Sequence, residues 1–266
     1  MKAGVSTASL YPLHAEDAFR ELARLGVTTA ELFANSTAEA REPVTGIIRD
    51  TMQEYGMEVV SFHPFSSPME SVYLFSEYDR RIEEMLTMYR EFFGTMNRLG
   101  AKIFVLHGAI LSSGCTPEHY VKQFRLLAEA AEEYGVTVAQ ENVSYCLSGR
   151  LDFLRMMKRE LGKYAKFVLD LKQCRRSHED IFEVVRALGE DIIHLHVSDA
   201  NSDRDCLPIG QGCFDFRRLM QEMGQLGYSG AYMWSFTAGI TMSIRGSGNP
   251  WTRSGKSRTR FDGGAG

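Results

Sequence analysis

Cysteine is scarce in this sequence, and its few copies do not form a recognisable pair. The chain has five cysteines, an odd number without a Cys-x-x-Cys motif, at positions 115, 146, 174, 206 and 213. This usage argues against a disulfide framework and against a zinc knot. We therefore expect reduced thiols in a cytoplasmic protein.

Long apolar runs are also missing. No segment approaches the roughly 20 apolar residues that span a membrane, and residues 1–7 lack the apolar core of a signal peptide. The net charge of −4 gives no overall attraction to nucleic acid or to an anionic membrane, so we expect neither as a partner. The composition that remains, 44% hydrophobic and 24% charged residues, is typical of a soluble globular protein with a large core.

Strand-like and helix-like segments alternate along the chain. Helical spacing of apolar residues leads up to Gly26, and Thr116-Pro117 has the composition of a helix start. Short apolar runs between the helices suit strands buried on both faces of a parallel sheet, and we expect them at 2–7, 28–33, 58–63, 102–107, 137–141, 167–170, 192–196 and 230–236. The chain of 266 residues suits one α/β domain, a (β/α)8 TIM barrel, which takes about 250.

Five of the expected strands end in a residue that can bind a metal or transfer a proton. These residues are His63, His107, Glu141, Asp170 and His196. In a barrel of parallel strands such ends meet at one rim, where the active sites of this fold lie. The series therefore predicts a functional site.

The two carboxylates and His196 are the strongest candidates for binding a metal. Glu141 follows an apolar strand, and a buried carboxylate is usually paired or bound to metal, so a salt bridge is the alternative. For Asp170 the alternative is capping of the next loop, and for His196, which shares a strand face with His194, a hydrogen-bonded core histidine. Carboxylate and imidazole ligands suit Mn²⁺, Mg²⁺, Co²⁺ or Zn²⁺.

Four motifs of this chain resemble the sugar phosphate isomerase/epimerase family, part of the xylose isomerase-like TIM barrel superfamily that also contains endonuclease IV. The resemblance covers residues 1 to about 233 and rests on Gln140-Glu141-Asn142, Leu169-Asp170-Leu171-Lys172-Gln173, His194-Leu195-His196-Val197-Ser198-Asp199 and Leu207-Pro208-Ile209-Gly210-Gln211-Gly212. It implies a divalent metal held by Glu141, Asp170, His196 and a second glutamate at the end of strand eight. It also implies proton transfer beside a sugar carbonyl through an enediolate, with Glu141 as one acid/base.

The same resemblance implies residues that contact the substrate. Gln173 stands three residues after Asp170, where relatives often carry a substrate-binding histidine, and Arg204 is near a substrate-contacting arginine. His63 and His107 match histidines that bind additional zinc in the endonuclease branch, whereas in isomerases such positions more often contact sugar hydroxyls. We place both histidines on the substrate side.

The chain departs from the family at strand eight. Residues 235–266 hold seven glycines, five Lys/Arg and one acid, offer no strand-end carboxylate at Ser235, and show no helical period, so we expect the eighth helix to be missing or disordered. We therefore divide the chain into a barrel, 1–234, and an irregular tail, 235–266.

A frameshift is one explanation of the tail. Met233-Trp234-Ser235 can be encoded ATG TGG AGC, and one restored G gives ATG GTG GAG, which reads Met-Val-Glu and supplies the missing glutamate. A genuine flexible basic tail is the alternative. Without that glutamate we predict weak metal binding and little or no epimerase activity.

Three functions remain open. The first is a metal-dependent isomerase or epimerase of a small sugar, sugar phosphate or keto-polyol. The second is an endonuclease IV-like repair enzyme, against which stand Gln173 and the charge of residues 1–234, 25 Lys/Arg against 33 Asp/Glu. The third is a non-catalytic sugar-binding barrel. The sequence leaves open the substrate, the metal and the oligomeric state, for which a homo-oligomer is one option.

Overall fold

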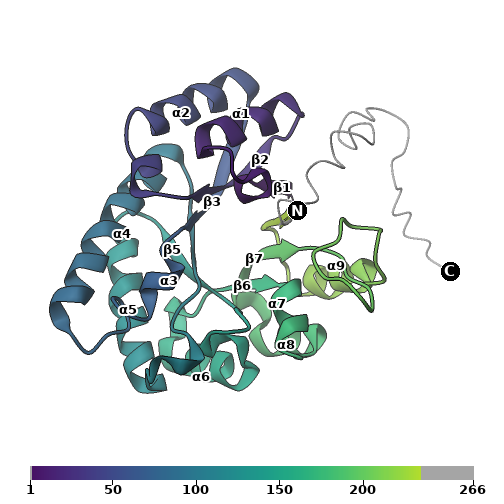
Figure 1. The fold of residues 1–266 in the computed structure, drawn as a ribbon. Coiled ribbons are helices and arrows are strands. Elements are labelled where there is room, and N and C mark those ends of the chain that lie inside the picture. The colour runs from purple at the N-terminus through teal and green to yellow at the C-terminus, as the bar shows by residue number, and fades with distance from the viewer. Residues whose placement is uncertain (1, 235–266) are drawn as a thin grey trace.

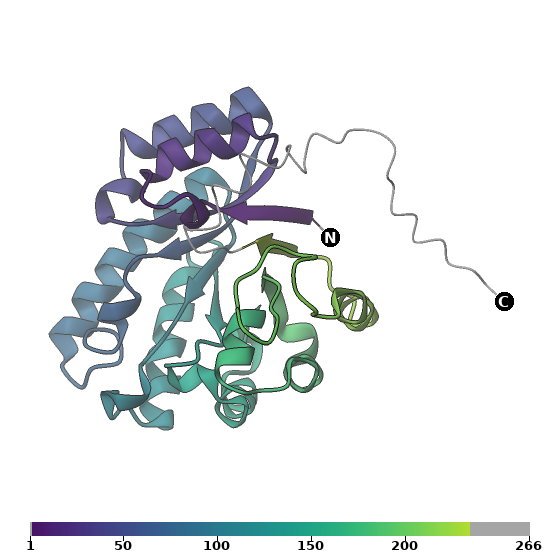
Figure 2. The same cartoon turned by 45° about the vertical axis from the view of Figure 1, so that its right-hand side comes forward.

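Eight short parallel strands pair in chain order and close into a barrel in the computed structural model, which describes residues 2–234 (Figure 1). β1 and β8 lie side by side and complete the ring (Figure 2). The predicted TIM barrel is therefore confirmed. The strands are β1 Lys2–Ser6, β2 Thr29–Ala34, β3 Glu58–Pro64, β4 Ile103–Leu106, β5 Thr137–Glu141, β6 Phe167–Asp170, β7 Ile192–Val197 and β8 Ala231–Trp234.

The longer helices lie around the outside of the strands, and each contacts the next longer helix along the chain. The helix bounds are α1 Ala15–Arg24, α2 Val44–Tyr55, α3 Ser67–Glu70, α4 Asp79–Leu99, α5 Pro117–Glu132, α6 Leu151–Leu161, α7 Leu171–Arg176, α8 Ile181–Leu188 and α9 Phe216–Gln225. Short 3-10 turns lie between them at η1 Thr7–Leu10, η2 Thr37–Ala40, η3 Leu111–Ser113, η4 Leu147–Gly149, η5 Gly162–Tyr164 and η6 Gly189–Asp191.

Local chemistry explains where α4 ends and where α5 begins. The Thr116 hydroxyl accepts a hydrogen bond from the His119 backbone N–H, and Pro117 occupies the first turn of α5, where its missing N–H costs nothing. Gly100 ends α4 at a φ of 77°, a left-handed conformation that suits glycine. The sequence predicted the start of α5. It did not foresee the short helices α3 and α7, which directly follow β3 and β6.

Alternation along the strands places polar side chains above an apolar layer. Val105, Ala139 and Val168 form a small buried cluster separate from the main core, and each precedes a predicted site residue by two positions. Because side chains two apart on a strand share a face, the predicted site residues lie on the same side as this cluster, one layer nearer the rim. The main core fills the space between the strands and the helices.

Several expectations fall on residues 235–266, which lie outside the described part of the chain. They include the missing glutamate at Ser235, the absent eighth helix, the frameshift and the division at 234. These remain predictions. Among residues 2–234, no helix combines the length and the apolar character needed to cross a membrane.

Candidate metal centre

The barrel brings together the three residues to which the sequence assigned a metal. Glu141, Asp170 and His196 come from the ends of β5, β6 and β7, and each offers a ligand atom within 4.8 Å of the other two. His196 Nδ1 lies 3.2 Å from Glu141 Oε1 and 3.8 Å from Asp170 Oδ2. All three are buried, so these donors face one another with little water between them.

His63 and His107 lie on the other oxygen of the same glutamate. The His63 and His107 Nε2 atoms are 3.6 and 2.9 Å from Glu141 Oε2, and 2.9 Å from each other. Their Nδ1 atoms are directed elsewhere: that of His63 lies 3.2 Å from the Pro64 carbonyl oxygen and that of His107 3.3 Å from the Tyr145 hydroxyl. Glu141 therefore joins two groups of donors, one through each carboxylate oxygen.

One atom of this cluster tests whether a cation fits. Glu141 Oε2 is buried and accepts no hydrogen bond among the described residues, although two imidazole nitrogens are close. A buried carboxylate oxygen without a hydrogen-bond partner is costly unless a positive charge compensates it. Carboxylate and imidazole donors are the set that divalent transition metals and Zn²⁺ prefer. The residues present therefore fit a divalent metal.

Asp170 caps a helix, where the sequence suggested a loop, and its other oxygen faces the candidate metal site. Its Oδ1 accepts a hydrogen bond from the Gln173 backbone N–H at 2.9 Å and so caps α7. Its Oδ2 faces His196 and, at 3.8 Å, Lys172 Nζ. Because only Oδ1 takes part in the cap, Oδ2 remains available to coordinate a metal.

The side chains at the end of β5 hold the neighbouring strand ends in place. The Gln140 amide donates to the carbonyl oxygen of His107 at 2.9 Å, and its own oxygen accepts from the Tyr120 hydroxyl. The Asn142 amide donates to the carbonyl oxygen of Asp170 at 3.0 Å. The Gln140-Glu141-Asn142 motif thus fixes the ends of both β4 and β6 relative to Glu141.

The buried charges shift one another's pKa values. Burial raises the pKa of Asp170 to about 6, against the opposing charge of Lys172. Burial alone would also raise the pKa of Glu141, but His107 and His196 hold it well below its usual value. Burial acts to lower the pKa of His196, yet the carboxylates of Glu31 and Glu141 raise it well above its usual value. Without a cation, the cluster favours ionised Glu141 beside protonated His196, and a metal would compete with that proton.

The two remaining predicted residues, Gln173 and Arg204, are not among the groups of candidate ligands. The Gln173 side-chain oxygen accepts hydrogen bonds from the Ser144 backbone N–H and hydroxyl at 3.1 and 2.9 Å. Arg204 is exposed, in a turn where its backbone N–H donates to Asn201 Oδ1 at 2.9 Å. Their roles in binding substrate stay predictions.

Sequence reasoning missed Glu31 and Ser61, which are fully buried within the barrel, and considered the neighbouring His194 only as a core histidine. Glu31 and Ser61 stand in the middle of β2 and β3, whereas the sequence analysis weighed residues at strand ends. Glu31 and His194 form with His196 a further group whose ligand atoms lie within 4.8 Å of one another. The available signal was a charged residue inside the apolar run Thr29–Ala34.

The loop after β7 is organised by Asp199. Its carboxylate accepts hydrogen bonds from four backbone N–H groups, those of Ala200, Gly210, Gly212 and Phe214, at 2.8 to 3.1 Å. A side chain at Gly212 would collide with this carboxylate, because its Cβ would lie 2.3 Å from Asp199 Oδ1. The two motifs that contain Asp199 and Gly212 are therefore two halves of one loop.

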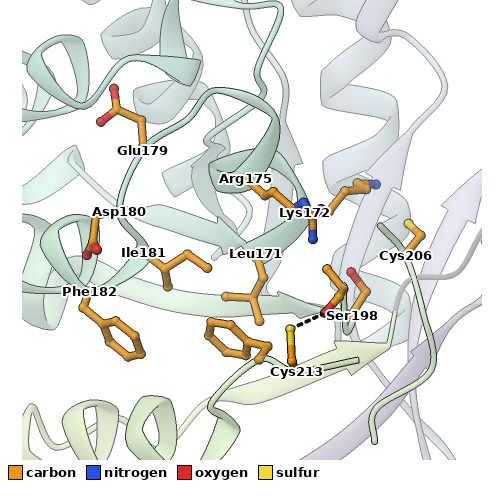
Figure 3. Close-up of a pocket in the computed structure, with 12 residues that line it drawn as sticks. Leu171, Lys172, Arg175, Glu179, Asp180, Ile181, Phe182, Ser198, Cys206 and Cys213 are labelled. Carbon is orange, nitrogen blue, oxygen red and sulfur yellow. Dashed lines mark hydrogen bonds between the residues drawn. The ribbon is translucent and has the colours of Figure 1, made fainter. Parts of the chain in front are cut away.

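A cavity of about 430 Å³ adjoins this loop, between α7, the start of α8 and the segment after β7 (Figure 3). Its volume is in the range of small-molecule pockets. Phe182 and Phe214 stack on its wall with ring centroids 6.1 Å apart. Lys172 also lines the cavity, and its ammonium group lies 3.8 Å from Asp170 Oδ2. The cavity therefore adjoins the candidate metal site.

Known proteins share the fold of this chain. The family model described as xylose isomerase-like TIM barrel matches residues 19–240. An uncharacterized protein of Mycobacterium leprae is 26% identical over 225 residues, which cover 76% of this chain and 75% of that protein.

Two solved structures illustrate the structural likeness. A D-tagatose 3-epimerase-like protein has a TM-score of 0.75 at 19% identity, covering 92% of this chain and 94% of that chain. The IolI protein, solved with a bound zinc atom, has a TM-score of 0.72 at 17% identity, covering 89% of each chain. At these identities the likeness establishes the fold.

Proposed function

We propose that this chain, which belongs to the xylose isomerase-like TIM barrel family, is built as a divalent-metal-dependent isomerase or epimerase of a small sugar, sugar phosphate or keto-polyol. The observation that carries the proposal is the buried group of Glu141, Asp170 and His196, whose ligand atoms lie within 4.8 Å of one another. The second oxygen of Glu141, Oε2, faces His63 and His107. The sugar epimerases among the structural relatives support the substrate class.

Each residue has a role in this proposal. Asp170 and His196 hold the metal together with Glu141, which also moves a proton at the carbon beside the substrate carbonyl. His63 and His107 bind substrate hydroxyls at the rim. A bound divalent ion would polarise the carbonyl and stabilise negative charge on its oxygen. Burial of the cluster excludes water, which strengthens these interactions.

Activity is expected to be weak in the chain as written. The family resemblance implies a second glutamate where Ser235 stands, and one acid/base group contributes roughly 10²–10⁴-fold to a rate. We therefore propose that the 266-residue chain binds metal weakly and turns over little.

The decisive experiment compares two proteins, the chain as written and the chain translated in the restored frame, which carries glutamate at position 235. Metal content is measured by elemental analysis, and epimerisation of a panel of ketoses, ketose phosphates and keto-polyols is followed by chromatography. We expect stoichiometric metal and turnover only in the second protein. Full activity of the chain as written would refute the impairment, and absence of both metal and turnover from both proteins would refute the function.

A matched pair of variants tests the role of Glu141. Glu141→Gln removes the shared charge and should abolish metal binding, whereas Glu54→Gln removes an exposed glutamate of α2 and should change nothing.

An abasic-site endonuclease is the second candidate because His63, His107 and Glu141 form a ligand group of their own. Charge opposes it: of 30 Lys/Arg and 34 Asp/Glu, five basic and one acidic residue follow residue 234, which leaves −8 for residues 1–234. Nicking of a duplex with one abasic site by the zinc-loaded protein would favour this candidate over the epimerase. Sugar binding without turnover in the restored frame would favour a non-catalytic barrel.

A further inference from the structure

The two ring nitrogens of His196 face different carboxylates. Nδ1 is directed at Glu141 and Asp170, as described above, and Nε2 lies 3.0 Å from Glu31 Oε2. Glu31 belongs to β2, which is not a neighbour of β7 in the barrel. The contact therefore spans the inside of the barrel, beneath the rim.

Other buried groups fix the Glu31 carboxylate in turn. The Ser61 hydroxyl donates a hydrogen bond to Glu31 Oε2 at 2.9 Å and lies 3.1 Å from His194 Nε2. His194 Nε2 is itself 3.4 Å from the same carboxylate oxygen. Glu31, Ser61 and His194 are at most 1% exposed, so their side chains have little freedom to rearrange.

This arrangement determines the tautomer and the ring orientation of His196. A histidine that binds a metal through one nitrogen must carry its hydrogen on the other, and a carboxylate that accepts that hydrogen fixes both the tautomer and the ring plane. With Nε2–H donated to Glu31, the lone pair of Nδ1 faces Glu141 and Asp170. A rotated ring or the opposite tautomer would withdraw this lone pair.

We propose that Glu31 is a positioning residue for the metal centre, which holds His196 with its Nδ1 lone pair directed at the site of the cation. This inference rests on the metal site of the proposed function, and not on the choice of sugar. Ser61 and His194 contribute indirectly, because both contact the Glu31 carboxylate and hold it in place.

The test measures Zn²⁺ affinity by competition with a chelator, in the full-length chain and three variants. Removing such a carboxylate partner typically costs about 10–100-fold in metal affinity, and we expect this loss for Glu31→Ala and Glu31→Gln. Glutamine keeps the shape of the side chain, but its NH₂ group can face Nε2 and select the wrong tautomer. Glu31→Asp keeps the charge and should recover part of the affinity.

Two controls separate positioning from general destabilisation. Glu39→Gln alters another buried glutamate, whose carboxylate accepts backbone N–H groups of Ala15 and Asn35, and should leave Zn²⁺ affinity unchanged. Nitrogen-15 spectra of the zinc-loaded protein should show the His196 hydrogen on Nε2 in wild type and a changed Nε2–H signal in Glu31→Gln.

The outcomes distinguish this inference from the proposed function. Equal Zn²⁺ affinity of wild type and all Glu31 variants would overturn positioning alone. Failure of both this chain and the restored-frame protein to bind Zn²⁺ would overturn the metal site as well. Loss of one of two bound Zn²⁺ ions in Glu31→Ala would show that Glu31 is a ligand and not a positioning residue.

Discussion

Asn142 and Asp170 are joined by two reciprocal hydrogen bonds between neighbouring strand ends. The Asn142 side-chain NH₂ donates to the Asp170 carbonyl oxygen at 3.0 Å, and its Oδ1 accepts from the Asp170 backbone N–H at 2.7 Å. A carboxamide is the side chain that offers a donor and an acceptor side by side. Because Glu141 directly precedes Asn142, the pair fixes the spacing between Glu141 and Asp170 at the rim.

Asn142→Asp should damage both stability and metal binding. The new carboxylate oxygen would face the Asp170 carbonyl oxygen, two acceptors without a hydrogen, at a cost of about 1–3 kcal/mol in the free energy of unfolding. Zinc affinity should fall about 10–100-fold because the ligand spacing is lost. Denaturant titration and chelator competition measure the two effects. Asn97→Asp, at an exposed asparagine of α4, is the control and should leave Zn²⁺ affinity unchanged.

Asp170→Asn separates capping from metal binding. Asparagine caps helices as well as aspartate does, so α7 should remain and the free energy of unfolding should not fall. Zinc affinity should fall more than about 100-fold, since even indirect partners of a metal cost 10–100-fold. Calorimetric titration with Zn²⁺ measures this. Unchanged affinity would leave the cap as the only role of Asp170.

Glu70 should make stability depend on pH. Burial raises its pKa to about 7, although the Gly108 N–H and the Tyr89 hydroxyl oppose this. The unfolded pKa is about 4.3, so between pH 4.3 and 7 the folded state holds a proton that the unfolded state has lost. The contribution of Glu70 to the free energy of unfolding is therefore fully present below the unfolded pKa and is lost as the pH rises toward 7.

Comparison with Glu70→Gln isolates this effect. Between pH 4.5 and 8 the stability of wild type relative to Glu70→Gln should decline by about 3 kcal/mol, measured by guanidinium unfolding. Glu54→Gln should show no such pH-dependent difference. A difference that stayed constant over this range would contradict the prediction.

Gly4→Ala should destabilise the barrel where β1 lies between its neighbours. The added Cβ would come 2.6 Å from the Thr29 carbonyl oxygen and 2.5 Å from the Met233 side chain. Overpacking of this kind costs about 1–3 kcal/mol in the free energy of unfolding. Gly224→Ala in α9 is the control: no atom lies within 4 Å of its added Cβ, and alanine favours a helix by up to about 1 kcal/mol over glycine.

The sequence predicted the barrel and the strand-end cluster because both follow from local patterns. Apolar runs at barrel intervals specify parallel strands, and the residue that ends such a strand necessarily lies at the rim. Glu141, Asp170 and His196 were accessible to this reasoning, and the structure places them together.

The contacts of the mid-strand residues, such as Glu31, could not be predicted from the sequence in this way. Glu31 meets His196 only because β2 and β7 face each other across the closed barrel, and a linear sequence does not show which mid-strand side chains meet there. The position of His63 and His107 on the second oxygen of Glu141 depends equally on ring orientation, which hydrogen bonds to Pro64 and Tyr145 decide.

The sharing of Glu141 has a thermodynamic consequence. The two oxygens of Glu141 share one negative charge. A ligand that binds Oε2 beside His107 therefore reduces the negative charge on Oε1, which faces His196, and a ligand on Oε1 has the same effect on Oε2. By reciprocity the two ligands must alter each other's affinity by the same factor. Under the proposed function, this shared carboxylate would couple the binding of sugar hydroxyls at one half of the rim to the binding of a cation at the other half.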